Sequence, residues 1–279
     1  MISPPGLTLK RPGILIPVFF LSLIHTCLTG QVSWEGTSSA ALGSTSVCSQ
    51  GYWCANQSQA GLGFIKQSSI SIQHCRPYLL KELGISAFSG QFTTGSGALG
   101  ISLSTRGLTG FRQSSMWLSY GLKLLPHISA GMGIHLWNST MEENFIHAPG
   151  ISFALGLQVR INEQWIIGAR LLHPVAWSAH PGVPVNQLLR IECGASFSFF
   201  NTARIYSEVH IKPEEGIALC SGLEWILKPQ INLRTGFCSG PYTFCWGLSF
   251  KFTKWILEFS FRYRTNSGLS PLTSITHEW

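Results

Sequence analysis

The chain has 279 residues, of which 45% are hydrophobic and only 11% are charged, and its formal net charge is +7. Disordered chains are poor in apolar residues, so the apolar content excludes disorder. Soluble domains average about 25% charged residues, so an ordinary water-facing surface is not expected here. The basic residues are scattered singly along the chain, which argues against nucleic acid as a partner. The 29 glycines, 17 Phe and 10 Trp favour strands over helices.

The first 30 residues have the pattern of a signal peptide. Lys10 and Arg11 precede an uncharged, mainly apolar run from Gly13 to Ile24, and small polar residues follow up to Gly30. A spanning helix needs about 20 apolar residues, so this run is too short for one. We expect cleavage near Gly30, with lipidation of Cys27 or an uncleaved apolar tail as the alternatives. No later segment is a long apolar run, so the exported chain is either a soluble domain or a β-barrel of an outer membrane.

From residue 68 onward, apolar residues alternate with small or polar ones between turns rich in Gly, Pro, Asn and Ser. This period of two predicts β-strands. We expect 14 of them: Ser68–Cys75, Leu83–Phe92, Ala98–Thr105, Ser115–Leu124, Ile128–Trp137, Ile151–Ile161, Trp165–Leu172, Leu188–Phe199, Ala203–Ile211, Ile217–Leu227, Ile231–Phe237, Tyr242–Phe252, Trp255–Tyr263 and Thr273–Trp279.

Strand length and the composition of the two faces indicate a closed barrel. The segment from Tyr242 to Phe252 has one wholly apolar face, and its other face carries Thr, Cys, Gly, Ser and Lys. Membrane-spanning strands need about 9–11 residues, whereas strands of soluble proteins usually have about 5–6. The prediction is an all-β, closed antiparallel transmembrane barrel. The alternative is a soluble secreted β-sandwich that binds carbohydrate or protein through its Trp residues.

Several segments carry a resemblance to a known family. They are Leu42-Gly43-Ser44-Thr45, Gln59-Ala60-Gly61-Leu62, Leu79-Leu80-Lys81-Glu82-Leu83 and Ser267-Gly268-Leu269-Ser270-Pro271. Together they resemble the FadL-like outer-membrane barrels, particularly the branch that contains PorV and PorQ. The second segment is similar to the family's NPAGLA or NQAGLA motif, although Ser58 stands where the family usually has Asn.

The resemblance implies 14 strands over residues 68–279 and an amino-terminal plug or lining, residues 31–67, folded into the lumen. It also implies an outer-membrane location, contact with membrane lipid, and one of two roles. The chain would either transport a hydrophobic or amphipathic solute or belong to a secretion or surface-attachment complex with partner proteins. The last strand departs from the family's assembly signal at Thr273 and His277 and keeps only Ile275 and Trp279.

Five residues of the expected plug are candidates for binding or for structure: Asn56, Gln59, Ala60, Gly61 and Leu62. We expect a tight bend in which Gly61 adopts a positive φ and Leu62 packs against the barrel wall. A structural role is the favoured interpretation of this motif, with ligand contact as the alternative.

Charged residues on the polar strand faces are expected to point into the lumen. These are Arg160, Arg170, Arg190, Glu192, Arg204, Glu208, Lys212, Glu224, Arg234, Glu258, Arg262 and Arg264. Buried charges need partners because desolvation is costly, so we expect Arg–Glu pairs that fasten the strands together. An anion path is the alternative for the excess of Arg.

The sequence has no motif for a hydrolase, a metalloprotease, a phosphate-binding loop or a calcium loop, and its histidines lack metal-ligand spacing. We therefore expect no enzyme activity, no metal and no cofactor. A serine hydrolase built into the wall is the third hypothesis, which no motif requires.

Two further expectations concern cysteines and loops. Cys48 and Cys54 form the favoured local disulfide, whereas Cys238 and Cys245 are interpreted as small strand residues that are out of register with each other. The longest connections are expected at residues 138–150 and 174–187, and they are the candidates for contact with a partner.

Overall fold

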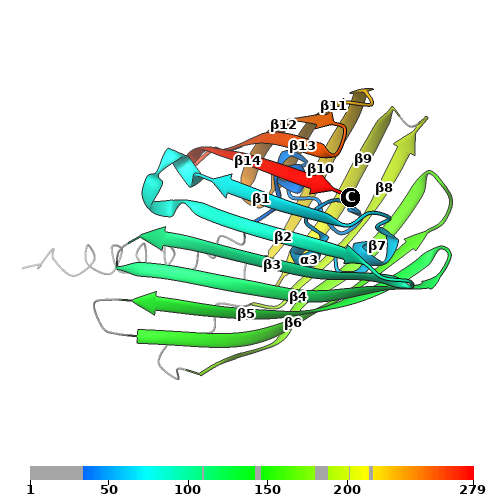
Figure 1. Ribbon diagram of the computed structural model, residues 1–279. Helices are drawn as coiled ribbons and strands as arrows, with labels where there is room; N and C mark the ends of the chain where they lie inside the picture. The colour runs from blue at the N-terminus through cyan, green and yellow to red at the C-terminus, as the bar shows by residue number, and fades with distance from the viewer. Residues whose placement is uncertain (1–33, 109, 142–145, 180–187, 201, 214–215) are drawn as a thin grey trace, which may run out of the picture. The chain divides into compact units, whose positions relative to one another are not determined.

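The computed structural model describes residues 34–279, except 109, 142–145, 180–187, 201 and 214–215. The expected signal peptide, residues 1–30, lies outside the described residues. Fourteen antiparallel strands follow one another around a closed barrel, in which each strand pairs with its sequence neighbours. Figure 1 shows these strands in chain order. The predicted strand number is therefore confirmed.

The strands are β1 (Ser69–Cys75), β2 (Ile85–Thr93), β3 (Gly97–Leu108), β4 (Phe111–Leu125), β5 (Ile128–Met141), β6 (Ile146–Arg160), β7 (Trp165–Ser178), β8 (Arg190–Phe199), β9 (Ala203–Lys212), β10 (Gly216–Lys228), β11 (Ile231–Ser239), β12 (Tyr242–Phe252), β13 (Trp255–Arg264) and β14 (Gly268–Glu278). The main difference from the predicted ranges is that β3, β5 and β7 end later than expected and β4, β6 and β14 begin earlier.

The first and last strands close the barrel. Ser69 of β1 pairs with Glu278 of β14, and the pairing continues to Cys75 and Leu272. A closed ring leaves no exposed strand edge, which is the arrangement that hydrocarbon requires of a sheet. The alternative of a two-sheet sandwich was wrong, because β1 pairs with both β2 and β14 within one continuous sheet.

The two faces of the wall differ as the alternation requires. On β12, Phe244 and Trp246 are about half exposed, whereas Cys245 between them is 2% exposed and faces inward. The same contrast of exposed apolar and buried small or polar residues recurs along β7 and β10. None of the helices in the described ranges is long and apolar enough to cross a membrane.

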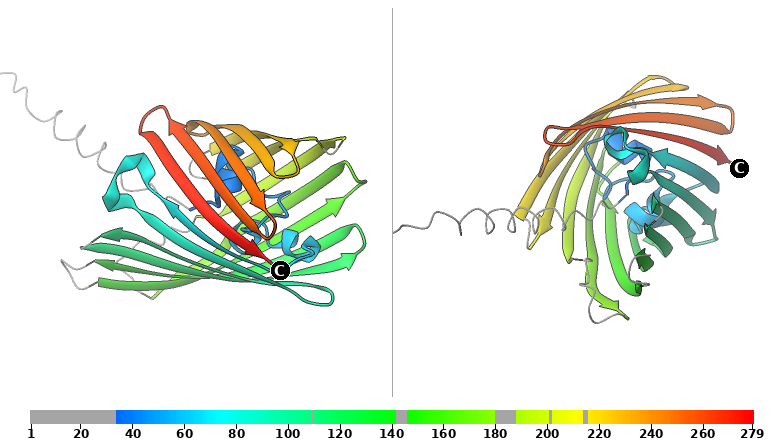
Figure 2. Two further views of the ribbon diagram at one scale, coloured as in Figure 1. Left: turned by 45° about the horizontal axis from the view of Figure 1, so that its top comes forward. Right: turned by 90° about the vertical axis from the view of Figure 1, so that its left-hand side faces the viewer.

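Residues 34–67, here called the lumenal segment, lie inside the ring of strands (Figures 1 and 2). The segment contains α2 (Thr37–Ala41), α3 (Cys54–Gln57) and the 3-10 helix η1 (Ala60–Phe64). Nearly all residues of these three helices are buried. Helices this short gain little stability by themselves, so contacts with the wall must hold the segment in place.

The connections between strands are shorter than the sequence suggested. The expected loop at residues 138–150 is mostly paired strand, because Asn138 pairs with Pro149 and Trp137 with Gly150 across β5 and β6. At residues 174–187, β7 continues to Ser178, so this connection also begins later than expected. Between β1 and β2 the chain forms two short 3-10 helices, η2 (Pro77–Leu79) and η3 (Lys81–Leu83).

Candidate functional site

The motif Gln59–Leu62 places η1 against the inner face of strands β3 to β6. Leu62 is completely buried and packs with Cys54 and with Ala98 of β3. Gly131 of β5 lies so close to the backbone of Gln59 that a β-carbon there would overlap it. The wall therefore uses a residue without a side chain at a point where the backbone of the lumenal segment approaches it closely.

Gly61 is required for a different reason from the one predicted. The expected positive φ is wrong, because the residue lies within the 3-10 helix η1 and is not among the glycines with positive φ. Instead, a β-carbon at this position would overlap the backbone oxygen of Ser49. The requirement is steric and comes from another part of the lumenal segment, so no local sequence signal could reveal it.

Arg170 of β7 joins the wall to the lumenal segment. Its guanidinium donates to Gln59 Oε1 at 2.9 Å and to the backbone oxygen of Asn56, and it pairs with Glu192 of β8 at 3.4 Å. Glu192 also accepts from Arg190 at 3.2 Å. The side chains of Arg170 and Glu192 are only 6% and 3% exposed, so this is a desolvated pair supported by hydrogen bonds.

Glu208 of β9 holds a second part of the lumenal segment. Its Oε1 accepts from the backbone N–H groups of both Ser46 and Val47 at 2.8 Å. Its other oxygen lies 3.2 Å from Nε2 of His210, the neighbouring inward-facing residue of the same strand. Two adjacent backbone donors on one carboxylate oxygen fix both the position and the direction of the chain at this point.

A third group of charges holds the beginning of the segment. Glu258 of β13 is fully buried, pairs with Arg234 at 2.6 Å and accepts from Ser38 Oγ at 2.9 Å. Arg234 also pairs with Glu224 at 2.8 Å. The predicted Arg–Glu pairing is thus confirmed for the pairs of Arg234.

Arg262 of β13 makes a related contact, since it pairs with Glu35 of the lumenal segment at 3.1 Å. Among the described contacts, three predicted lumenal arginines have no carboxylate partner: Arg160, Arg204, and Arg264, which donates to the Tyr78 hydroxyl at 2.9 Å. Arg160 donates to Gln50 at 2.7 Å and covers the ring of Phe64, and Arg204 donates to Ser198 Oγ at 2.8 Å. The wall charges with described contacts therefore form several local groups rather than a single site.

Uncharged amides supply contacts that the sequence did not single out. Gln73 of β1 donates to the backbone oxygen of Glu35 at 2.7 Å, and Gln91 of β2 donates to that of Gly51 at 3.1 Å. Gln158 of β6 donates to the backbone oxygens of Val47 and Ser49. The strand alternation predicts that these three glutamines face inward. It does not predict their partners, because an amide is common on any polar strand face.

Rings and imidazoles form a separate cluster on the inner wall of β4, β5 and β7. Trp117 and His135 stack with ring centroids 4.3 Å apart, and His135 lies 5.6 Å from His173. His173 has a positive φ of 53° at the point where the β6–β7 register shifts, and its Nδ1 lies 2.7 Å from Ser152 Oγ. Nδ1 of His135 is buried without a hydrogen-bond partner. The cluster is thus packed ring against ring, with one buried polar atom left without a partner.

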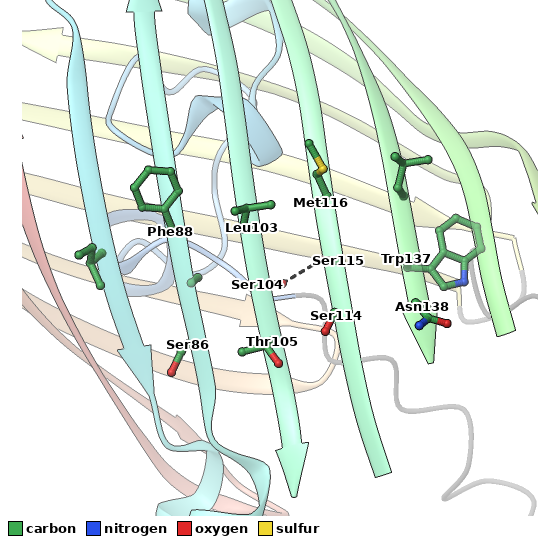
Figure 3. Close-up of a pocket in the computed structure, with 13 residues that line it drawn as sticks. Ser86, Phe88, Leu103, Ser104, Thr105, Ser114, Ser115, Met116, Trp137 and Asn138 are labelled. Atoms are coloured by element: carbon green, nitrogen blue, oxygen red, sulfur yellow. Dashed lines mark hydrogen bonds between the residues drawn. The ribbon is translucent and has the colours of Figure 1, made fainter. Parts of the chain in front are cut away.

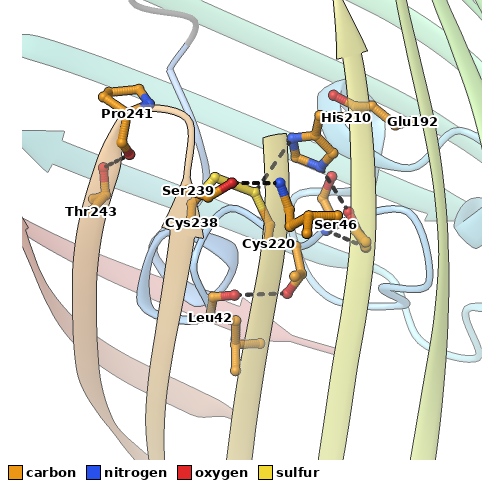
Figure 4. Close-up of a disulfide and its surroundings, with 12 residues drawn as sticks. Leu42, Ser46, Glu192, His210, Cys220, Cys238, Ser239, Pro241 and Thr243 are labelled. Atoms are coloured by element: carbon orange, nitrogen blue, oxygen red, sulfur yellow. Dashed lines mark hydrogen bonds and ion pairs between the residues drawn. A yellow bond between two sulfur atoms is a disulfide. The ribbon is translucent and has the colours of Figure 1, made fainter. Parts of the chain in front are cut away.

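The cysteines differ from the expected pattern. Cys48 and Cys54 are both free thiols, so the predicted local disulfide is wrong. The disulfide instead joins Cys220 of β10 to Cys238 of β11, which are paired residues of neighbouring strands (Figure 4). Burial raises the pKa values of the Cys48 and Cys54 thiols to about 12. Over the described residues, no three His, Cys, Asp or Glu side chains are grouped to hold a metal ion.

Comparisons with known proteins identify the fold. No family model and no curated protein matches the sequence. The toluene transporter TbuX of Ralstonia pickettii superposes with a TM-score of 0.64 and 11% identity, over 89% of this chain and 99% of that one. The CymD monoaromatic hydrocarbon channel gives 0.66 and 11%, over 89% and 98%. A Pseudomonas aeruginosa FadL homologue gives 0.62 and 8%, over 89% and 98%. At these identities the comparison establishes the fold alone, so this closed 14-stranded β-barrel has the same fold as these proteins.

Proposed function

We propose that the chain is an outer-membrane channel for small hydrophobic solutes and that the lumenal segment is its barrier. The observation that carries the proposal is a closed barrel with an apolar outer wall whose lumen holds residues 34–67. The matching structures include a toluene transporter and a monoaromatic hydrocarbon channel. Residues 1–30, as a signal peptide, would deliver the chain to that membrane.

The contacts of the lumenal segment support a barrier that is held at separate points. Arg170, Glu208 and Glu258 each bind a different part of it. Releasing one of them leaves the other two in place, so a partial displacement of the segment needs less free energy than its complete release. Such a segment would block ions and water while a solute displaces only part of it.

The aromatic–imidazole cluster supports the choice of solute. Trp117, His135 and His173 present ring faces on the inner wall, and rings stack on rings with little need for hydrogen bonding. A small aromatic hydrocarbon would match this surface better than a sugar or an ion.

Uptake by whole cells tests the proposal. Cells that produce the full chain should take up radiolabelled toluene faster than cells without it, and the purified protein in planar bilayers should show little ion conductance. Equal uptake by both cell types, with the barrel correctly inserted, would contradict the transport role.

The secretion-complex role implied by the PorV and PorQ resemblance makes a different prediction. The full chain, purified from its native membrane in mild detergent, should then keep a stoichiometric protein partner. Purification of the barrel alone, together with toluene uptake, favours the channel.

A further inference from the structure

A hollow of about 640 Å³ lies on the outer wall across strands β1 to β5. Its volume falls within the range of about 300–1,000 Å³ that is typical of small-molecule pockets. Large side chains border it, and its floor is the wall itself at Ala87, Ser104 and Ser115, where the side chains are small. Figure 3 shows the hollow and the hydrogen bond between Ser104 and Ser115.

The outward-facing residues of the lining form two neighbouring rows. Strand pairing joins Ile72 to Phe88, Phe88 to Leu103, Leu103 to Met116 and Met116 to Leu136, which makes one continuous apolar row. In Figure 3 the labelled members Phe88, Leu103 and Met116 lie side by side on adjacent strands.

The next outward-facing row toward the β3–β4 turn is polar. Ser86 pairs with Thr105, Thr105 with Ser114, and Ser114 with Asn138. Four polar side chains thus stand in register beside a wholly apolar row. The hollow is therefore amphipathic across its two rows.

The wall beneath the hollow is unbroken. The β2–β3 pairing runs without a register shift from Ile85 to Thr93, and the β3–β4 pairing runs without one from Gly97 to Leu108. A molecule in the hollow consequently binds from outside and has no gap between strands through which to reach the lumen.

The polar row lacks partners in the protein. Ser86 Oγ lies 3.1 Å from His74 Nδ1, but the side chains of Thr105, Ser114 and Asn138 make no hydrogen bond to the described part of the chain. An unpaired hydroxyl or amide is unfavourable against hydrocarbon, so these groups need an external acceptor. None of the described residues that line the hollow is charged. An ester carbonyl oxygen can accept from these groups without a charged residue in the lining.

We propose that the hollow is a binding site for a membrane phospholipid. One acyl chain lies along the apolar row, and the ester carbonyls of the lipid accept hydrogen bonds from Thr105, Ser114 and Asn138. This inference uses the membrane location of the proposed function but does not depend on transport, so either can fail while the other holds.

Native mass spectrometry of the purified full chain tests the site. The protein in detergent is titrated with diacyl phosphatidylethanolamine, and the retained lipid is measured after release from the micelle. Ser114→Phe fills the hollow and should lower retention about tenfold. Ser207→Phe is the matched control, because Ser207 is an exposed, outward-facing serine of β9 outside the hollow, and it should retain lipid as the wild type does.

A second variant tests the polar row without filling the space. The wild type should prefer the diacyl lipid to its diether analogue several-fold, and the double variant Thr105→Val, Ser114→Ala, which keeps only Asn138 of the three donors, should lose most of this preference. A heat-dependent gel shift establishes that each variant is folded. Wild-type retention by Ser114→Phe, tighter binding of palmitate than of phospholipid, or occupation of this face by a second copy of the chain would each overturn the proposal.

Discussion

Replacing Arg170 by Met should loosen the lumenal segment while leaving the strands paired. The side chain is 6% exposed and contacts Gln59, the Asn56 backbone and Glu192. Removing one partner of a buried ion pair costs about 3–5 kcal/mol. Glu192 keeps its contact with Arg190, so we expect the lower end, about 3 kcal/mol. At 1.4 kcal/mol per tenfold, the displaced state of the segment becomes about a hundredfold more populated.

Amide hydrogen exchange measures this change directly. In the Arg170→Met protein, amides around Asn56 and Gln59 should exchange about a hundredfold faster, whereas strand amides should keep their protection. Arg190→Met is the matched control, because Arg190 contacts the same carboxylate but is 23% exposed and has no hydrogen bond to the lumenal segment among the described contacts. Its effect should stay below about 1 kcal/mol. Equal exchange at residues 54–62 in all three proteins would refute the role of Arg170.

Three other changes test the structure. Gly61→Ala should lower stability by about 1–3 kcal/mol in urea titrations because its β-carbon overlaps the Ser49 oxygen, whereas Gly95→Ala, where nothing lies within 4 Å, should not; equal midpoints would contradict the steric argument. Cys54 should resist maleimide at neutral and mildly alkaline pH, because burial raises the pKa of its thiol to about 12. Exposed Cys193 should react in detergent, and labelling of both thiols at one rate would contradict the burial of Cys54. Replacing Cys220 and Cys238 by Ser should cost about 3 kcal/mol for a sequence separation of 18, measured by unfolding with and without reductant; free thiols at both positions in the oxidised wild type would contradict the pairing.

The strands could be predicted because each carries its own signal. Alternation is local, and the segment from Tyr242 to Phe252 was located at both ends because a turn bounds it on each side. The sequence does not predict the late ends of β5 and β7 or the early start of β6, because Asn138, Pro174 and Pro149 are residue types typical of loops. They are instead accommodated in the long strands of this wall.

The sequence predicts which charged residues of the wall face the lumen, but it does not predict which residues of the lumenal segment they contact. The inward position of Arg170 and Glu192 follows from strand parity, and their adjacency follows from the β7–β8 register. The partners Gln59, Ser46 and Ser38 belong to a segment without periodicity, so no pattern links them to the wall. The predicted disulfide was wrong for a similar reason. Cys220 and Cys238 are brought together by the β10–β11 register, whereas Cys48 and Cys54 are only close in sequence.

Pairing of β1 with β14 constrains how the molecule can be assembled. The wall cannot be completed until Leu272 and Glu278 reach the edge that Ser69 and Cys75 offer. Residues 34–67 precede that edge in the chain, and in the closed barrel they occupy the space that the strands enclose. Closure of the barrel therefore joins the two ends of a sheet that extends from Ser69 to Glu278, and it also encloses the segment that precedes the first strand.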